Sequence, residues 1–231
     1  LPVIEMPILI SVINDPLTLT VLLVIAVVTI ANGCNMIDGA NGLTLIMAIV
    51  ILNALAYLSF RLDDFFILNI CVILFCMMLT LLLFNYPMGI IFLGDSGAYF
   101  IGFVCSVLTI TFYGRHPELS DWGAILILIY PLTEVVFSVV RKFYSSKSHP
   151  LHPDRKHIHT LFFDYFLGKG FSHRTANNLV MPSMFLLWVF PAISIPYVFQ
   201  SSLLTIIACV SYLALYLLHY FLLRRTNCSA T

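Results

Sequence analysis

The sequence predicts an all-α, polytopic membrane protein with one integral-membrane domain over residues 1–231, and two observations support this class. First, 61% of the residues are hydrophobic and 10% are charged, with a mean hydropathy of +1.01, whereas a soluble domain is about half apolar. Second, the apolar runs are long and lack the period-two alternation of half-buried strands. A backbone in lipid must satisfy its own hydrogen bonds, which a helix does within one segment, so we predict helices.

About seven apolar runs approach the roughly 20 residues that a helix needs to cross a bilayer. In chain order, the predicted spans are 17–34, 43–60, 65–84, 98–113, 122–140, 179–199 and 203–223. Pro2, Pro7 and Pro16 precede the first span and predict a short loop or a helix cap. Gly33, Gly39 and Gly42 follow or end that span, and we expect them to break the helix and let the backbone approach a ligand closely.

The connections between the later spans also have distinct compositions. The second and third spans form a predicted hairpin around residues 61–64, and the fourth follows residues 94–97, Gly-Asp-Ser-Gly, which are typical of a helix N-terminus. The fifth span leads into a predicted His- and Arg-rich loop, 141–178. A loop of this length is usually functional or disordered, and its aromatic residues favour a packed or membrane-surface segment.

Positive charge is concentrated on one face if the spans alternate across the membrane. Nine of the eleven Lys and Arg residues lie on that face, and only Arg61 and Arg115 lie on the other. The nine are Arg141, Lys142, Lys147, Arg155, Lys156, Lys169, Arg174, Arg224 and Arg225. Because Lys and Arg concentrate in cytoplasmic loops, we predict that this face is cytoplasmic.

Two acids, Asp38 and Asp95, lie at the ends of apolar spans on the predicted cytoplasmic face. Each alone could be a helix cap. Their joint position beside glycine-rich turns favours a site that binds a metal ion or a phosphate. Mg²⁺ takes oxygen ligands and is often shared between carboxylates and substrate phosphates.

Amide side chains gather near the first of these acids. Asn32, Asn35 and Asn41 lie at spacings of three and six residues, which places Asn32 and Asn35 on one face if the helix continues. Amides both donate and accept hydrogen bonds, which suits the recognition of a nucleobase, a ribose or a sugar. The alternative is a set of turn and C-cap asparagines.

The segment from His149 to His159 holds four of the seven histidines. Within it, Arg155 offers a planar guanidinium that matches a phosphate bidentately, and His157 and His159 supply further donors. A zinc site and a basic patch on anionic lipid are the alternatives for this segment.

Two other classes of function remain open. Glu134 lies within the predicted fifth span, where we expect it to face the bundle and favour a structural hydrogen bond over catalysis. In an ion-coupled transporter or channel, Asp38 and Glu134 would bind ions. An inert membrane scaffold would use the basic segment to bind membrane lipid. No nucleic-acid partner is expected in any of these classes.

Three motifs follow one another in the predicted cytoplasmic connections. They are Asn32-x-x-Asn35-x-x-Asp38-Gly-x-x-Gly42-Leu43, Phe92-Leu-Gly-Asp95-Ser-Gly97 and His152-Pro-Asp-Arg155-x-His157-x-His159. Together they resemble the polyprenyl-phosphate N-acetylhexosamine-1-phosphate transferase family, of the glycosyltransferase family 4 type. The order of the three motifs in a multispan chain makes the resemblance specific, and it covers essentially the whole chain.

The resemblance implies transfer of a sugar phosphate from a UDP-N-acetylhexosamine to undecaprenyl phosphate, with release of UMP, to start a lipid-linked cell-envelope polysaccharide. It implies a bacterial inner-membrane enzyme with a cytoplasmic site, dependent on Mg²⁺ with Mn²⁺ as a substitute, and it allows a homodimer. Asp38 and Asp95 would be catalytic, with Asp95 as a metal ligand. The implied substrate-binding residues are Asn32, Asn35, Asn41, Arg155, His157 and His159.

The chain departs from the family pattern at three points. Asn41 stands where the family commonly has a second Asp, and Thr160 stands where many members have another His. The paired-aspartate motif of an earlier cytoplasmic loop is absent, and Asp63-Asp64 lies on the opposite predicted face. We therefore expect a C-terminal part of a parent with about eleven spans, inactive by itself.

Overall fold

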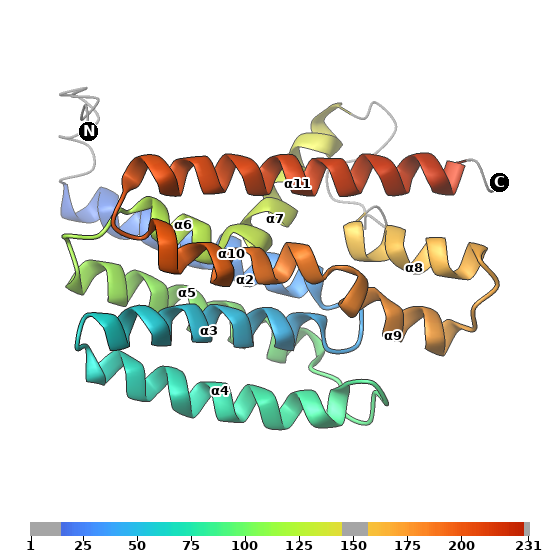
Figure 1. The fold of residues 1–231 in the computed structure, drawn as a ribbon, viewed down its shortest axis with the longest axis horizontal. Helices are drawn as coiled ribbons and strands as arrows, with labels where there is room; N and C mark the ends of the chain where they lie inside the picture. Colours follow the sequence, from blue (N-terminus) through green and yellow to red (C-terminus); the bar gives the residue numbers. More distant parts are fainter. Residues whose placement is uncertain (1–14, 145–156, 229–231) are drawn as a thin grey trace.

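The computed structural model describes residues 15–144 and 157–228, and every regular element within these ranges is an α-helix (Figure 1). The predicted all-α membrane class is confirmed. In chain order the helices are α2 (Pro16–Ile37), α3 (Leu43–Arg61), α4 (Phe65–Asn85), α5 (Gly94–Arg115), α6 (Trp122–Ile127), α7 (Ile129–Tyr144), α8 (Ile158–Gly168), α9 (His173–Ser183), α10 (Phe185–Val198) and α11 (Ser202–Cys228).

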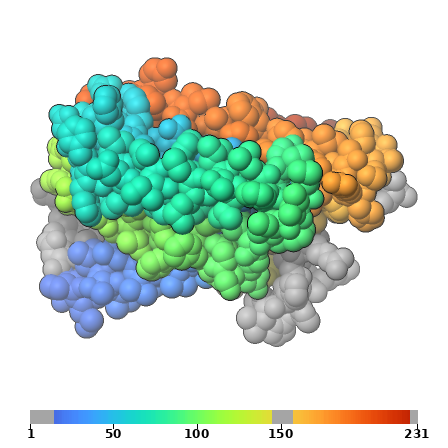
Figure 2. Space-filling view, turned by 90° about the horizontal axis from the view of Figure 1, so that it is seen from below, coloured from blue at the N-terminus to red at the C-terminus, as the bar shows by residue number. Residues whose placement is uncertain are grey.

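Six segments of the described chain are long and apolar enough to cross a membrane. They are α2, α3, α4, α5, the combined α9–α10 segment His173–Val198, and α11. Figure 2 shows α4 lying across one face of the molecule. Its exposed side chains include Phe66, Ile73 and Leu83, as expected of a surface that faces lipid.

The prediction of a seventh continuous span at 122–140 is wrong. The chain there forms two helices, α6 and α7, which meet at Leu128. Pro131 lies in the first turn of α7 and has no N–H to donate to the preceding turn, so a helix cannot continue through this point undisturbed. Hydropathy does not register the break, because the residues on both sides of it are apolar.

The prediction of one long loop at 141–178 is also wrong for the residues that the structure describes. Helix α7 continues to Tyr144, and α8 and α9 occupy most of the second half of the segment. Gly170, with φ +86, follows the end of α8, and Ser172 caps α9 by accepting a hydrogen bond from the Thr175 amide. Of the two alternatives for the aromatic residues, packing holds for Phe162, which is buried, and for Phe163, Tyr165 and Phe166, which pack against the core, whereas Phe171 is exposed.

The long helices lie side by side, so their connections gather at the two ends of the bundle (Figure 1). One end, called here the polar end, holds the α2–α3 turn, the α4–α5 connection and the start of α8, while α8 and α9 project beyond it. The opposite end holds the α3–α4 turn and the α5–α6 loop. The predicted alternation therefore places Asp38 and Asp95 at the same end, away from Arg61 and Arg115.

Candidate active site at the polar end

The last turn of α2 and the first turn of α5 bring two of the predicted site residues together. Asn35 Nδ2 donates to Asp95 Oδ1 at 3.1 Å, although the two residues are sixty positions apart in the sequence. Asp38 is the C-cap residue of α2, and its Oδ1 accepts a hydrogen bond from Thr44 Oγ1 at 3.0 Å. Asp95 lies in the first turn of α5, whose N-cap is Leu93, so Asp95 is not a cap, whereas Asp38 does occupy a cap position.

The charge of Asp95 acts on the Asp38 carboxyl group. Burial raises the pKa of Asp38 above its usual value, the charge of Asp95 raises it further, and the hydrogen bond from Thr44 acts in the opposite direction. Within the described residues, no Lys or Arg forms an ion pair with either acid. A cation between or beside these carboxylates would therefore relieve unfavourable electrostatics.

The other two asparagines contact protein groups. Asn32 is exposed on α2, and its amide donates to the Val28 carbonyl at 2.7 Å. The structure therefore does not bring Asn32 to the pair of carboxylates. Asn41 binds α9: its backbone N–H donates to Asn177 Oδ1 at 2.9 Å and its Nδ2 donates to Asn178 Oδ1 at 3.2 Å. Both bonds fix the α2–α3 turn against α9.

Sequence reasoning missed the polar residues that hold this turn in place. Asn85 Oδ1 accepts from the Gly42 amide, and Asn85 Nδ2 donates to the Ile91 carbonyl at 2.7 Å. Tyr86 Oη donates to the Asn178 carbonyl at 3.2 Å. The position of Asn85 directly after the predicted span 65–84 was the available signal.

His159 joins the third motif to the first. Its side chain is buried, and a Cβ added at Gly39 would overlap Nε2 of the ring. Burial lowers the pKa of His159 to about 4; the Glu134 carboxylate raises it and His157 lowers it further. His159 is therefore neutral near pH 7 and can offer hydrogen bonds but no positive charge.

His157 precedes α8 as its N-cap residue and links that helix to α7. Its Nδ1 lies 3.2 Å from Glu134 Oε2 and 3.4 Å from Ser138 Oγ. The rings of His157 and His159 are stacked, with centroids 5.6 Å apart and planes inclined by 3°. The expected structural hydrogen bond of Glu134 is thus present, and it ends on a predicted site residue. Arg155 lies outside the described residues.

The glycines of the first motif bring protein segments together. Gly33 lies within α2, where the helix continues unbroken, and a Cβ there would overlap the Pro131 carbonyl of α7. The prediction that Gly33 breaks the helix is therefore wrong, because the residue serves close helix packing. Gly42 has φ +78 at the start of α3, a conformation that favours glycine.

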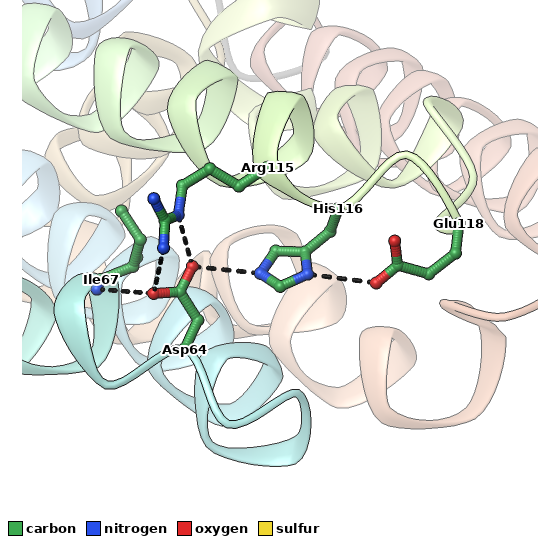
Figure 3. Close-up of polar contacts among 5 residues, drawn as sticks. All are labelled: Asp64, Ile67, Arg115, His116 and Glu118. Carbon is green, nitrogen blue, oxygen red and sulfur yellow. Dashed lines mark hydrogen bonds and ion pairs between the residues drawn. The ribbon is translucent and has the colours of Figure 1, made fainter.

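Asp64 at the opposite end belongs to a separate cluster (Figure 3). It accepts from Arg115 Nε at 2.7 Å and Nη2 at 3.1 Å, and it lies 3.1 Å from His116 Nε2. Glu118 Oε1 lies 3.1 Å from the other ring nitrogen, Nδ1. The cluster borders a surface cavity of about 560 Å³. Asp64 therefore does not supply a carboxylate to the polar end, as the sequence predicted.

The chain is similar in sequence to known proteins of one enzyme family. Residues 1–113 match the family model described as glycosyl transferase family 4. A Bacillus subtilis protein named "Probable undecaprenyl-phosphate N-acetylglucosaminyl 1-phosphate transferase" is 29% identical over 155 residues, which cover 66% of this chain and 42% of the relative. A Yersinia pestis undecaprenyl-phosphate alpha-N-acetylglucosaminyl 1-phosphate transferase is 28% identical over 157 residues, or 64% of this chain and 41% of the relative.

A third relative, the decaprenyl-phosphate N-acetylglucosaminephosphotransferase of Mycolicibacterium smegmatis, is 26% identical over 200 residues, or 78% of this chain and 47% of the relative. The chain thus spans less than half the length of these relatives. No solved structure matches it. The match of residues 1–113 to the glycosyl transferase family 4 model and the similarity to these relatives support the family that the motifs at the polar end resemble.

Proposed function

We propose that this chain contributes the active-site end of an enzyme that transfers an N-acetylhexosamine 1-phosphate from a UDP-sugar to undecaprenyl phosphate. In this reaction an oxygen of the lipid phosphate bonds to the β-phosphorus of the donor. The bond from that phosphorus to the bridging oxygen breaks, and UMP leaves. The enzyme would lie in a bacterial inner membrane with its polar end in the cytoplasm, and its product would start a lipid-linked glycan.

One observation carries the proposal: three motifs that are distant in the sequence meet at one end of the bundle. Asn35 bonds to Asp95, and His159 packs on Gly39 beside Asp38. Phosphoryl transfer needs positioned donors and charge stabilisation more than covalent catalysis, and amide, imidazole and carboxylate groups supply these. Asn35 would orient Asp95, while His159 would offer a neutral hydrogen bond to the donor substrate. Arg155 would hold the diphosphate.

The acids at the polar end fit a divalent cation. Carboxylate oxygens are ligands that Mg²⁺ prefers, and Asp38 and Asp95 lie close enough for one charge to affect the other. No group of three His, Cys, Asp or Glu side chains among the described residues is arranged to hold a metal ion, so substrate phosphates and water would complete the shell. Asp95 would be the direct ligand. When bound, Mg²⁺, or Mn²⁺ in its place, supplies positive charge that offsets the charge of the diphosphate.

The test is an Asp95→Asn variant of the full-length protein, with UMP release measured from UDP-N-acetylglucosamine and undecaprenyl phosphate. We expect loss of at least about two decades in turnover, because one group that stabilises the transition state is worth roughly 10²–10³ in rate. Asp121→Asn is the matched control, since Asp121 is an exposed acid at the opposite end whose side chain makes no cap hydrogen bond.

Unchanged turnover of the Asp95 variant at saturating Mg²⁺ would contradict the role of Asp95. No UMP release by the wild-type protein from any of a panel of UDP-sugars would contradict the proposed reaction itself.

A further inference from the structure

Glu134 is a buried carboxylate inside the bundle, directly behind the site. Its side chain is fully enclosed, with an exposed fraction of 0%. Buried carboxylates are unfavourable unless they are paired or hydrogen-bonded. The pairing that the structure provides is with His157, whose Nδ1 lies 3.2 Å from Oε2. The buried carboxylate therefore depends on this imidazole for its hydrogen bond, and the imidazole depends on the carboxylate in the same way.

The surroundings hold the pair in place from two sides. Ser138, one helical turn after Glu134 on α7, places Oγ 3.4 Å from the same His157 nitrogen. Tyr212 and Tyr216, one turn apart on α11, are fully buried near Glu134 and help to exclude water from it. Oε1 of Glu134 has no hydrogen-bond partner among the described residues, so the contact of Oε2 with His157 is what fixes the carboxylate.

We propose that Glu134 is a positioning residue that fixes the orientation and the tautomer of His157 for donor binding. This inference rests on the proposed function. A carboxylate only accepts hydrogen bonds, so Nδ1 of His157 must carry a proton to donate to it. In the neutral ring, Nε2 is then an acceptor. Within the site it accepts a hydrogen bond from a hydroxyl or amide N–H group of the UDP-sugar.

The stacked histidine pair links the orientation of the His157 ring to the site. His159, the partner in the stack, packs on Gly39 beside Asp38, so the plane of the His157 ring is aligned with a residue of the site. Rotation of His157 away from Glu134 would break the stack as well as the hydrogen bond. Glu134 thus acts on the substrate through His157, without touching it.

The first measurement is direct and does not need activity. In ¹⁵N-histidine spectra of the full-length protein at neutral pH, the His157 resonances, assigned by loss in His157→Gln, should show the Nδ1-protonated tautomer. Glu134→Gln can donate from its amide to Nδ1, and we expect it to shift His157 towards the Nε2-protonated form. An identical tautomer in the wild type and in Glu134→Gln would overturn the proposal.

The second measurement is kinetic. Glu134→Gln should lower kcat/KM for UDP-N-acetylglucosamine roughly tenfold to hundredfold, as happens when the orienting partner of a metal-bound histidine is removed. Most of the loss should appear as a higher donor KM, because a binding contact is lost. Glu134→Asp, which keeps the carboxylate, should recover part of it. In a His157→Gln background, Glu134→Gln should add no further loss.

Glu118→Gln is the matched control, because Glu118 Oε1 also lies 3.1 Å from a histidine Nδ1, that of His116 at the opposite end. It should leave donor KM unchanged. Independent, additive losses from the Glu134 and His157 variants, or a loss in kcat alone, would overturn the positioning role. If the wild-type protein releases no UMP, the proposed reaction fails, whereas the tautomer measurement still decides the structural part of the inference.

Discussion

At the scale of single residues, the close approach of His159 to Gly39 determines which groups the site can contain. Gly39 has no side chain, and the space that a Cβ would take is filled by Nε2 of His159. The glycine was expected to admit a ligand, and instead it admits a histidine of the third motif. The polar end is therefore held together by contacts between distant segments of the same chain.

We predict that Gly39→Ala displaces His159 and strongly reduces UMP release, by about one decade or more, because a shift of about 1 Å in a positioning group can cost 10²-fold. Gly168→Ala is the control. It lies on α8, the same helix as His159, and a Cβ there would meet no atom within 4 Å. Equal activity of the two variants would show that His159 can move without consequence.

At the scale of helices, the α3–α4 turn is tied to the end of α5 by Asp64, whose carboxylate is buried. Hydrogen bonds from Arg115 are the main reason why the pKa of Asp64 falls to about 2; burial acts in the opposite direction, and the Ile67 amide, His116 and the charge of Arg115 lower the pKa further. A carboxyl group whose pKa is lower in the folded state than in the unfolded state stabilises the fold when it is ionised.

Asp64→Asn should therefore lower the thermal midpoint of the purified protein in detergent at pH 7. The stabilisation is fully present above the ordinary pKa of about 4 and is lost as the pH falls towards 2. The difference in midpoint between wild type and variant should shrink over that interval. A difference that stays constant from pH 7 to pH 2 would show that the charge of Asp64 does not matter. Asp63→Asn, at the exposed neighbouring position with φ +55, is the comparison variant.

At the scale of the whole molecule, the arrangement of charges predicts orientation. Lys169 and Arg174 lie at the polar end, whereas Arg115 is paired with Asp64 at the opposite end. Because Lys and Arg prefer cytoplasmic segments, we predict that the polar end faces the cytoplasm.

Single cysteines in a cysteine-free full-length protein test this orientation. Lys169→Cys should resist a membrane-impermeant thiol reagent in intact cells, and Asp121→Cys should react, since both positions are exposed at opposite ends. Both should react after the cells are opened. Labelling of Lys169→Cys from outside would reverse the orientation and remove the cytoplasmic nucleotide site.

The sequence by itself determined the helical class, most of the spans and the alternation that brings Asp38 and Asp95 to one end. These properties follow from the length and composition of apolar segments, which are local, and from the requirement that a backbone in lipid bonds to itself. The three motifs also sufficed to predict the family. Hydropathy did not show the break at Leu128, because the residues on both sides are apolar, and Pro131 was the signal that marked it.

Only the tertiary structure decided which polar groups meet. Asn41, for which substrate binding stays a prediction, bonds to Asn177 and Asn178, more than 130 positions away. Glu134 lies on α7 and His157 is the N-cap residue of α8, twenty-three positions later in the sequence. A hydrogen bond forms where packing brings donor and acceptor within about 3 Å. Packing of buried helices is a collective property of the whole core, so these partners cannot be read from the periodicity of any one segment.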